Sequence, residues 1–204
     1  MDHKYFQHSD LAKVYCEKCN GCGDCCHGMT DTIHLDPWDI YQLSSGLGKS
    51  FEELRAAGIL ALHEEEGMIL PHLRMQDGKN GACPLLSSDG RCSIHPFRPG
   101  LCRLFPLGRD YDADTRTFRY FIVDNGCDMP GKIKVRISKW LGIAELSEYE
   151  KYVSEWHYFC KDVKSFLASS DDTAFAQQLN LFILKVFFVT PYVIPEDGSS
   201  DFYS

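Results

Sequence analysis

Five cysteines fall within eleven residues near the start of this 204-residue chain. They are Cys16, Cys19, Cys22, Cys25 and Cys26, in the string CEKCNGCGDCC. Thiolates at a two-residue spacing repel one another unless a cation holds them, and the usual cations are zinc and the iron of iron–sulfur clusters. Glycines at positions 21 and 23 let the chain wrap closely around such a group. The spacing therefore predicts a metal site.

A second group of cysteines follows in loop-like sequence: Cys83, Cys92, Cys102 and Cys127. Pro84 follows the first of them, and a Ser-Ser-Asp-Gly turn precedes the second. Loops suit metal ligation because side chains and backbone N–H groups can converge on one point. These N–H groups can also hydrogen-bond thiolate sulfur and tune the site.

Two metal chemistries fit the first group. Cys16, Cys19, Cys22 and Cys26 match the ferredoxin spacing C-x2-C-x2-C-x3-C. The C-x2-C pairs Cys19/Cys22 and Cys22/Cys25 equally suit a tetrahedral zinc site completed by later cysteines. An iron–sulfur cluster is the first expectation for the cofactor and Zn²⁺ the second, since the two share ligand chemistry. A disulfide framework is disfavoured, because no export signal is visible and adjacent cysteines pair poorly.

The composition is that of a globular protein, with 44% hydrophobic and 25% charged residues. A net charge of −8 argues against non-specific nucleic-acid binding. The chain has no apolar run of 18 residues and no apolar signal region at its start, so we expect no membrane span and a cytoplasmic location. The basic residues Lys132, Lys134, Arg136 and Lys139 are interpreted as a solvated face.

Helix-start signals occur twice in the first sixty residues. Asp36 can N-cap a helix whose first turn holds Pro37. Ser50 and Glu53 have the spacing of a capping box, and Gly58 is expected to end that helix.

Strand signals are short. Ile59–Leu62 and Met68–Leu73 flank a polar turn and predict a β-hairpin. Ile33–Leu35 and Phe118–Val123 predict two further short strands.

The C-terminal third has helical periodicity. One helix is expected to begin at an N-cap, Ser147, and to run to about Leu167. A second is expected from about Asp172 to Val189, with Pro191 stopping it. Cys160 lies on the apolar side of the first helix and is interpreted as a plain buried residue.

These elements predict an α+β fold, in which C-terminal α-helices cover a loop-rich cysteine-cluster core with short strands and a hairpin. Residues 1–131 are expected to form the metal-binding region, and its first 15 residues an arm leading into the cysteines. Residues 132–194 are expected to form a helical buttress packed on that region within one domain overall. Residues 195–204 are expected to be a loose tail.

Three strings resemble a known family: CNGCGDCC at residues 19–26, CPL at 83–85 and CSIHPFRPGLCRLFP at 92–106. They resemble the zinc- or iron-chelating CxxCxxCC proteins, often called YkgJ-like cysteine-cluster proteins. The resemblance implies an eight-cysteine metal site made of Cys19, Cys22, Cys25, Cys26, Cys83, Cys92, Cys102 and Cys127. Cys16 falls outside that pattern, and many members carry tyrosine where this chain has His95.

Two arginines flank Cys102 within four residues, Arg98 and Arg103. Eight thiolates carry more negative charge than one or two metals cancel. Guanidinium groups beside the ligands would offset the excess and donate hydrogen bonds. We expect this supporting role for both arginines, with binding of an anionic substrate as the alternative.

The predicted function is a cytosolic metal-chelating protein. Flagellin lysine N-methylases look similar around the cysteine cluster, so an iron–sulfur-dependent enzyme, methylase-like or redox, is one alternative. Another is a zinc-stapled module that presents Trp38, Phe97 or Phe105 to a protein partner. No GxGxxG, Walker loop or HExxH motif is present, and no catalytic residue is assigned.

Overall fold

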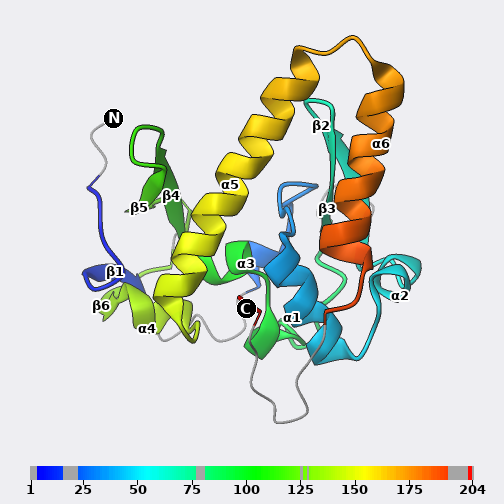
Figure 1. Cartoon of the computed structure of the whole chain (residues 1–204). Helices are drawn as coiled ribbons and strands as arrows, with labels where there is room; N and C mark the ends of the chain where they lie inside the picture. The colour runs from blue at the N-terminus through cyan, green and yellow to red at the C-terminus, as the bar shows by residue number, and fades with distance from the viewer. Residues whose placement is uncertain are drawn as a thin grey trace.

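The computed structural model describes residues 4–15, 23–76, 81–124, 126–127, 129–192 and 202–203. In this part of the chain the strands form three separate two-stranded antiparallel sheets, and the helices lie around and between them (Figure 1). None of the described helices is both long enough and apolar enough to cross a membrane.

Both predicted helix starts are confirmed. α1 (Pro37–Leu47) begins at Asp36, whose carboxylate accepts the Asp39 N–H, and the Asp39 carboxylate accepts the Asp36 N–H in return. α2 (Phe51–Ala56) begins with the equivalent exchange between Ser50 and Glu53. These reciprocal bonds satisfy N–H groups that have no partner within the helix.

The predicted hairpin is also confirmed. β2 (Leu60–Glu65) pairs with β3 (Met68–Leu73) across a turn whose two central residues, Glu66 and Gly67, have φ values of 51° and 82°. Two consecutive positive φ values match the right-handed twist of the flanking strands. The predicted strand at 33–35 is reduced to a single antiparallel bridge, His34 to His72.

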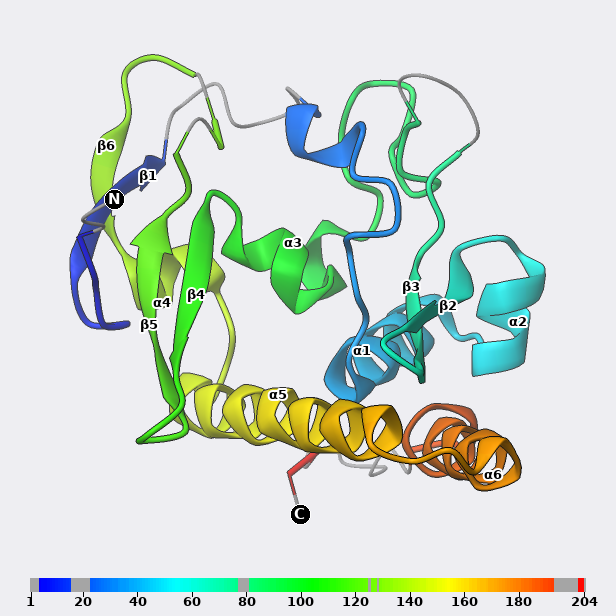
Figure 2. The ribbon, with the colours of Figure 1, turned by 90° about the horizontal axis from the view of Figure 1, so that it is seen from above.

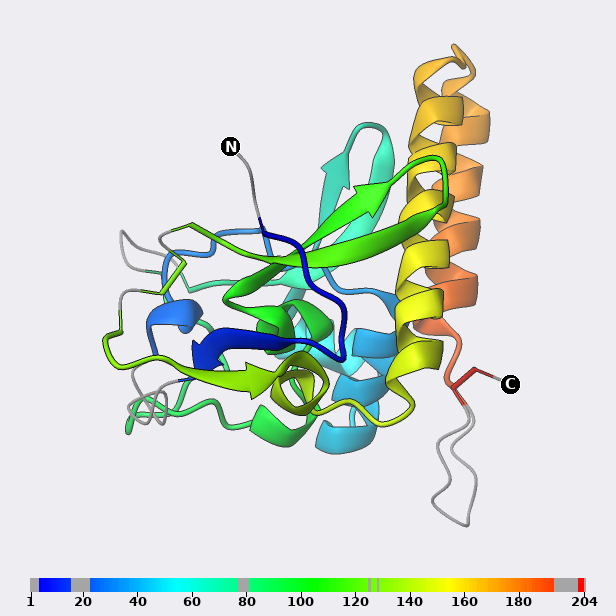
Figure 3. The ribbon, with the colours of Figure 1, turned by 90° about the vertical axis from the view of Figure 1, so that its left-hand side faces the viewer.

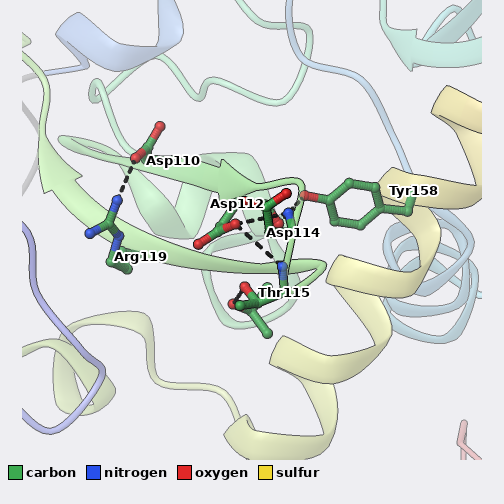
Figure 4. Close-up of polar contacts among 7 residues, drawn as sticks. Asp110, Asp112, Asp114, Thr115, Arg119 and Tyr158 are labelled. Carbon is green, nitrogen blue, oxygen red and sulfur yellow. Dashed lines mark hydrogen bonds and ion pairs between the residues drawn. The ribbon is translucent and has the colours of Figure 1, made fainter.

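A second hairpin joins β4 (Leu107–Asp112) to β5 (Thr117–Ile122). β5 corresponds to the strand predicted at Phe118–Val123. An ion pair of 3.2 Å between Asp110 and Arg119 crosses this sheet (Figure 4).

The turn of this second hairpin is tied to a C-terminal helix. The Asp112 carboxylate accepts the backbone N–H groups of Asp114 and Thr115 and so stabilises the turn. The Tyr158 hydroxyl, from α5 (Leu146–Ala168), donates to the Asp112 carbonyl at 2.6 Å (Figure 4). The hairpin and α5 are thereby fixed to each other.

The third sheet corrects one expectation. Residues expected to form an arm contribute β1 (Leu11–Tyr15), which pairs with β6 (Ile133–Arg136). α4 (Ile137–Leu141) follows β6 directly and packs on both strands. Ala12 and Val14 are buried by this packing, so this segment is part of the folded core.

α5 and α6 (Thr173–Leu184) are joined at one end and diverge from there, and the β3 strand of the first hairpin packs on both (Figure 1). The prediction that Ser147 caps α5 is wrong. The helix begins at Leu146, and Glu145 precedes it at φ 50° with no side-chain cap. The carbonyl of Glu145 accepts both the Glu148 and the Tyr149 N–H, which fixes the start without a serine hydroxyl.

The second predicted helix is confirmed from its cap onward. The Asp172 carboxylate accepts the Phe175 N–H at 2.9 Å at the start of α6. A π-helical turn, η4 (Lys185–Val189), ends the helix before Pro191.

The largest core cluster joins the helices to the loops. It contains α1 and hairpin residues together with Ile183 and Phe188 from the C-terminal helices, and with Cys83 and Leu85 from a cysteine-bearing loop. The fold is α+β, as predicted, with C-terminal helices packed on a loop-rich region.

Candidate metal centre

Five of the predicted ligands lie on three segments. Cys25 and Cys26 end the short 3₁₀ turn η2 (Asp24–Cys26), Cys83 and Cys92 lie in the loop that follows β3, and Cys102 lies in α3 (Gly100–Leu104). Figures 2 and 3 place η2 and this loop at the same end of the molecule. Cys16, Cys19 and Cys22 lie outside the described residues.

The first two segments are joined by backbone pairing. The Cys83 N–H donates to the Cys26 carbonyl at 2.8 Å, and His27 forms an antiparallel bridge with Ala82. The Gly28 N–H donates to the Gly81 carbonyl at 3.0 Å. These bonds hold the CxxCxxCC segment beside Cys83, although 57 positions separate Cys26 from Cys83 in the sequence.

A second set of backbone bonds folds the loop on itself. Leu86 and Cys92 form an antiparallel bridge, and the Ser93 N–H donates to the Leu85 carbonyl at 2.9 Å. The turn between them is the predicted Ser-Ser-Asp-Gly sequence, and Gly90 there has φ 78°. Cys83 and Cys92 are therefore held on neighbouring arms of one compact turn.

The ionisation of each of these thiols is influenced by at least one other cysteine. The hydrogen bond with the Cys26 thiol raises the pKa of Cys25 above its ordinary value. Burial is the main cause that raises the pKa values of Cys83, Cys92 and Cys102, and the charge of nearby cysteines adds to it in each case. Ionised thiolates at such positions repel one another. A bound soft cation neutralises this repulsion, so the thiols form a donor set suited to such a cation.

Other groups favour the thiolate form. The Leu85 N–H offsets part of the rise in the pKa of Cys83, and the Ile94 N–H offsets part of the rise in the pKa of Cys92. The positive charge of Arg98 also opposes the rise in the pKa values of Cys25 and Cys92. N–H donors and a cation around thiolate sulfur are the usual surroundings of a bound metal, so the residues present fit the implied group.

The two arginines differ in what they contact. Arg98 donates to the His95 ring nitrogen Nε2 and acts electrostatically on the thiols. Arg103 is 7% exposed and donates to four backbone carbonyls, those of Pro96, Arg98, Leu141 and Gly142. Its observed contacts therefore tie α3 to the loop before it and to the end of α4.

The remaining candidates are separate from this group. Cys127 is half-buried, and the Lys132 ammonium donates to its carbonyl. Cys160 is partly buried against the main core, as predicted, and burial raises its pKa to about 12. In residues 23–76, 81–124 and the other described ranges, no group of three or more His, Cys, Asp or Glu side chains stands ready to hold a metal ion.

One polar contact that positions α3 was not predicted. The buried Asp39 carboxylate accepts the Gly100 N–H at 2.7 Å. The Tyr149 side chain lies against Gly100, and Arg109 donates to the Tyr149 hydroxyl at 3.1 Å. Burial raises the pKa of Asp39 well above its usual range. The cap at Asp36 was visible in the sequence, but the contact of Asp39 with Gly100, 61 positions away, was not.

An α+β fold whose loops carry cysteines beside an arginine is the arrangement expected of a cysteine-rich metal-chelating protein. A family model confirms this class: it matches residues 18–127 and is described as "CxxCxxCC: Putative zinc- or iron-chelating domain". The chain belongs to this family. No curated protein and no solved structure matches it.

Proposed function

We propose that the chain is a cytosolic metal-chelating protein whose ligands are Cys19, Cys22, Cys25, Cys26, Cys83, Cys92, Cys102 and Cys127, with an iron–sulfur cluster as the first candidate and Zn²⁺ as the second. The observation that carries this proposal is the backbone pairing of Cys26 with Cys83, together with the effect of the Cys25 charge on the pKa values of Cys83, Cys92 and Cys102. In the cytosol their thiols stay reduced and available to a metal.

The surrounding residues prepare the thiols for a metal. The N–H groups of Leu85 and Ile94 favour the thiolate forms of Cys83 and Cys92, and Arg98 would offset the excess negative charge of the thiolates. An iron–sulfur cluster held here would supply one-electron transfer, whereas zinc would supply a redox-inert cross-link between the loops. In either case we expect metal binding and folding to be coupled, because the ligands come from separate loops.

The interaction-module alternative is weakened by the position of one of its three aromatic residues. Trp38 is only 6% exposed and packs on Tyr149, with 4.8 Å between the ring centroids. Phe97 covers Gly46, and a Cβ atom at that glycine would lie 2.4 Å from the phenylalanine ring. Trp38 is therefore committed to packing inside the protein.

Metal analysis tests the proposal. The protein would be purified anaerobically, and iron, zinc and acid-labile sulfide would be measured with a visible absorption spectrum on the same sample. We expect stoichiometric metal. Brown protein with sulfide would establish a cluster, and colourless protein with zinc the alternative. A native protein that folds with neither metal would refute the proposal.

Matched serine variants test the ligands. Cys102→Ser removes a proposed ligand and is expected to lower the metal content, whereas Cys160→Ser changes a cysteine outside the set and should leave it unchanged. Cys127→Ser tests the ligand with the least support, because the described contacts of Cys127 do not include the other thiols. Unchanged metal binding in Cys127→Ser would remove it from the ligand set.

A further inference from the structure

The outer face of the β1–β6 sheet carries basic side chains close together. In the register of this sheet, Lys13 lies directly opposite Lys134, and Leu11 lies directly opposite Arg136. All four side chains are exposed, whereas the other face of β1 is buried and α4 packs on it. Figure 3 shows the two strands side by side on the side of the molecule that faces the viewer.

The positive charges of this face have no acidic partner in the protein. Two lysines directly opposite each other repel, and such a pair destabilises a sheet. Within the described residues, neither Lys13 nor Lys134 nor Arg136 makes an ion pair with a carboxylate. Glu145 and Glu148 line a hollow together with Arg136, but neither pairs with it. An anionic group bound to this face would compensate the repulsion.

The backbone along the outer edge of β6 is also unpartnered. The Ile137 N–H donates to the Asp10 carbonyl. In an antiparallel sheet this bond places Lys134 and Arg136 at positions whose own N–H and C=O groups point away from β1. In the part of the chain that the structure describes, the Lys134 N–H and C=O and the Arg136 N–H have no hydrogen-bond partner. β6 therefore presents a free strand edge at the outside of the molecule (Figure 2).

A free edge beside basic side chains fits an extended acidic peptide. Peptides bind exposed sheet edges by adding a strand, with backbone hydrogen bonds that provide affinity and alternate side chains that provide specificity. Side chains on one face of a strand recur at every second residue. Carboxylates at alternate positions of the peptide would therefore lie beside Lys134 and Arg136. Ile133, which is 56% exposed, offers an apolar contact at the start of β6.

The same features argue against two other occupants of this edge. A second copy of β6 would bring Lys134 and Arg136 against their own kind, and lysines on an edge strand commonly prevent such pairing. The phosphates of a nucleic acid would bind the cations, but they would use neither the free backbone groups of β6 nor the exposed Ile133. A peptide with carboxylates satisfies all three features together.

We propose that β6 binds an acidic, extended segment of a partner protein as a third strand of the β1–β6 sheet. This surface adjoins the cysteine-bearing segments: β1 ends one residue before Cys16, and Lys132, which precedes β6, donates to the Cys127 carbonyl. A bound partner is thereby held beside these segments. The interface is small and transient, so we expect a dissociation constant of about 10–100 µM. The proposal is independent of the metal bound.

Isothermal titration calorimetry on the full chain, with a short synthetic peptide of alternating glutamate and valine residues, tests the surface. We expect binding that weakens at high ionic strength. Lys134→Glu should raise the dissociation constant at least about tenfold. This variant should remain folded, because it replaces a repulsion of Lys13 with an attraction. Lys151→Glu is the matched control, because Lys151 is an exposed lysine on α5, and it should leave binding unchanged.

Hydrogen exchange tests the added strand. Saturating peptide should slow exchange at the outward-pointing Lys134 and Arg136 amides at least about tenfold, whereas the Val135 amide, which points toward β1, should change little. No binding of the peptide, equal affinity in Lys134→Glu, or binding that leaves both amides unprotected would overturn the proposal. So would a peptide of alternating lysine and valine that binds as tightly, a wild-type dimer formed through β6, or tighter binding of a polyuridylate oligonucleotide through Lys134.

Discussion

Gly100→Ala should destabilise the protein through a single atom, the Tyr149 hydroxyl oxygen. An added Cβ would lie 2.0 Å from this oxygen, and the next atom of the ring would lie 3.3 Å away. Tyr149 cannot move aside easily, because its side chain is fully buried and its hydroxyl accepts a hydrogen bond from Arg109. Gly100 itself is held by Asp39. The clash must therefore be relieved by moving α3 or α5.

The expected change in the free energy of unfolding follows from two opposing effects of Gly100→Ala. Overpacking a well-filled site costs about 1–3 kcal/mol, and so close a contact belongs at the upper end of that range. Replacing glycine by alanine in a helix recovers up to about 1 kcal/mol. The net cost is about 2 kcal/mol, which corresponds to a melting temperature about 4–8 °C lower for a chain of this length.

A double-mutant cycle isolates this oxygen. Tyr149→Phe removes it and costs about 1–3 kcal/mol by leaving Arg109 without its acceptor. In the Tyr149→Phe background, Gly100→Ala should be close to neutral. The double variant should therefore be about 2 kcal/mol more stable than the sum of the two single effects predicts. Thermal unfolding of the four metal-loaded proteins, with metal content measured on each, would provide the values. Equal costs of Gly100→Ala in both backgrounds would refute the reasoning.

Three further changes are expected to have measurable effects. Gly46→Ala should cost about 1–3 kcal/mol, because its Cβ would lie 2.4 Å from the Phe97 ring; Phe97→Leu should relieve most of this cost in urea titrations. Asn180→Ala leaves the partly buried Ile69 N–H without its acceptor and should cost about 1–2 kcal/mol, with faster hydrogen exchange at that amide as the direct readout. Burial lowers the pKa of His72, so the unfolded chain binds its proton more tightly and stability falls as the pH drops below about 6.5. His72→Gln should reduce this decline between pH 7 and 5; an identical pH profile would contradict it.

Local signals predicted the elements whose stability is decided locally. The caps at Asp36 and Ser50 and the turn before Met68 each depend on residues within four positions, and all three formed as expected. The prediction of an N-cap at Ser147 was wrong because the Glu145 carbonyl fixes the start of α5 by itself. A serine near a helix start shows that a cap is available and does not show that it is used.

Elements that depend on distant partners were not predictable in the same way. β1 and β6 are short and carry charged residues, and they exist as strands because residues 11–15 meet residues 133–136. The contacts of Arg103 also depend on residues that are distant in the sequence. Its neighbours in the sequence suggested cysteine thiolates, whereas its donors bind carbonyls, two of them about forty positions away. For the site, the ligand set implied by the family resemblance stays a prediction, and the backbone pairing of Cys26 with Cys83 shows how two of its members meet.

The core cluster also bears on modularity. The family match ends at residue 127, yet the cluster that contains Cys83 and Leu85 is completed by Leu167, Ile183 and Phe188. A fragment cut at the family boundary would leave that apolar surface bare and would lose the whole of the β1–β6 sheet. The segment that sequence comparison recognises is thus a unit of ancestry and not a unit of folding.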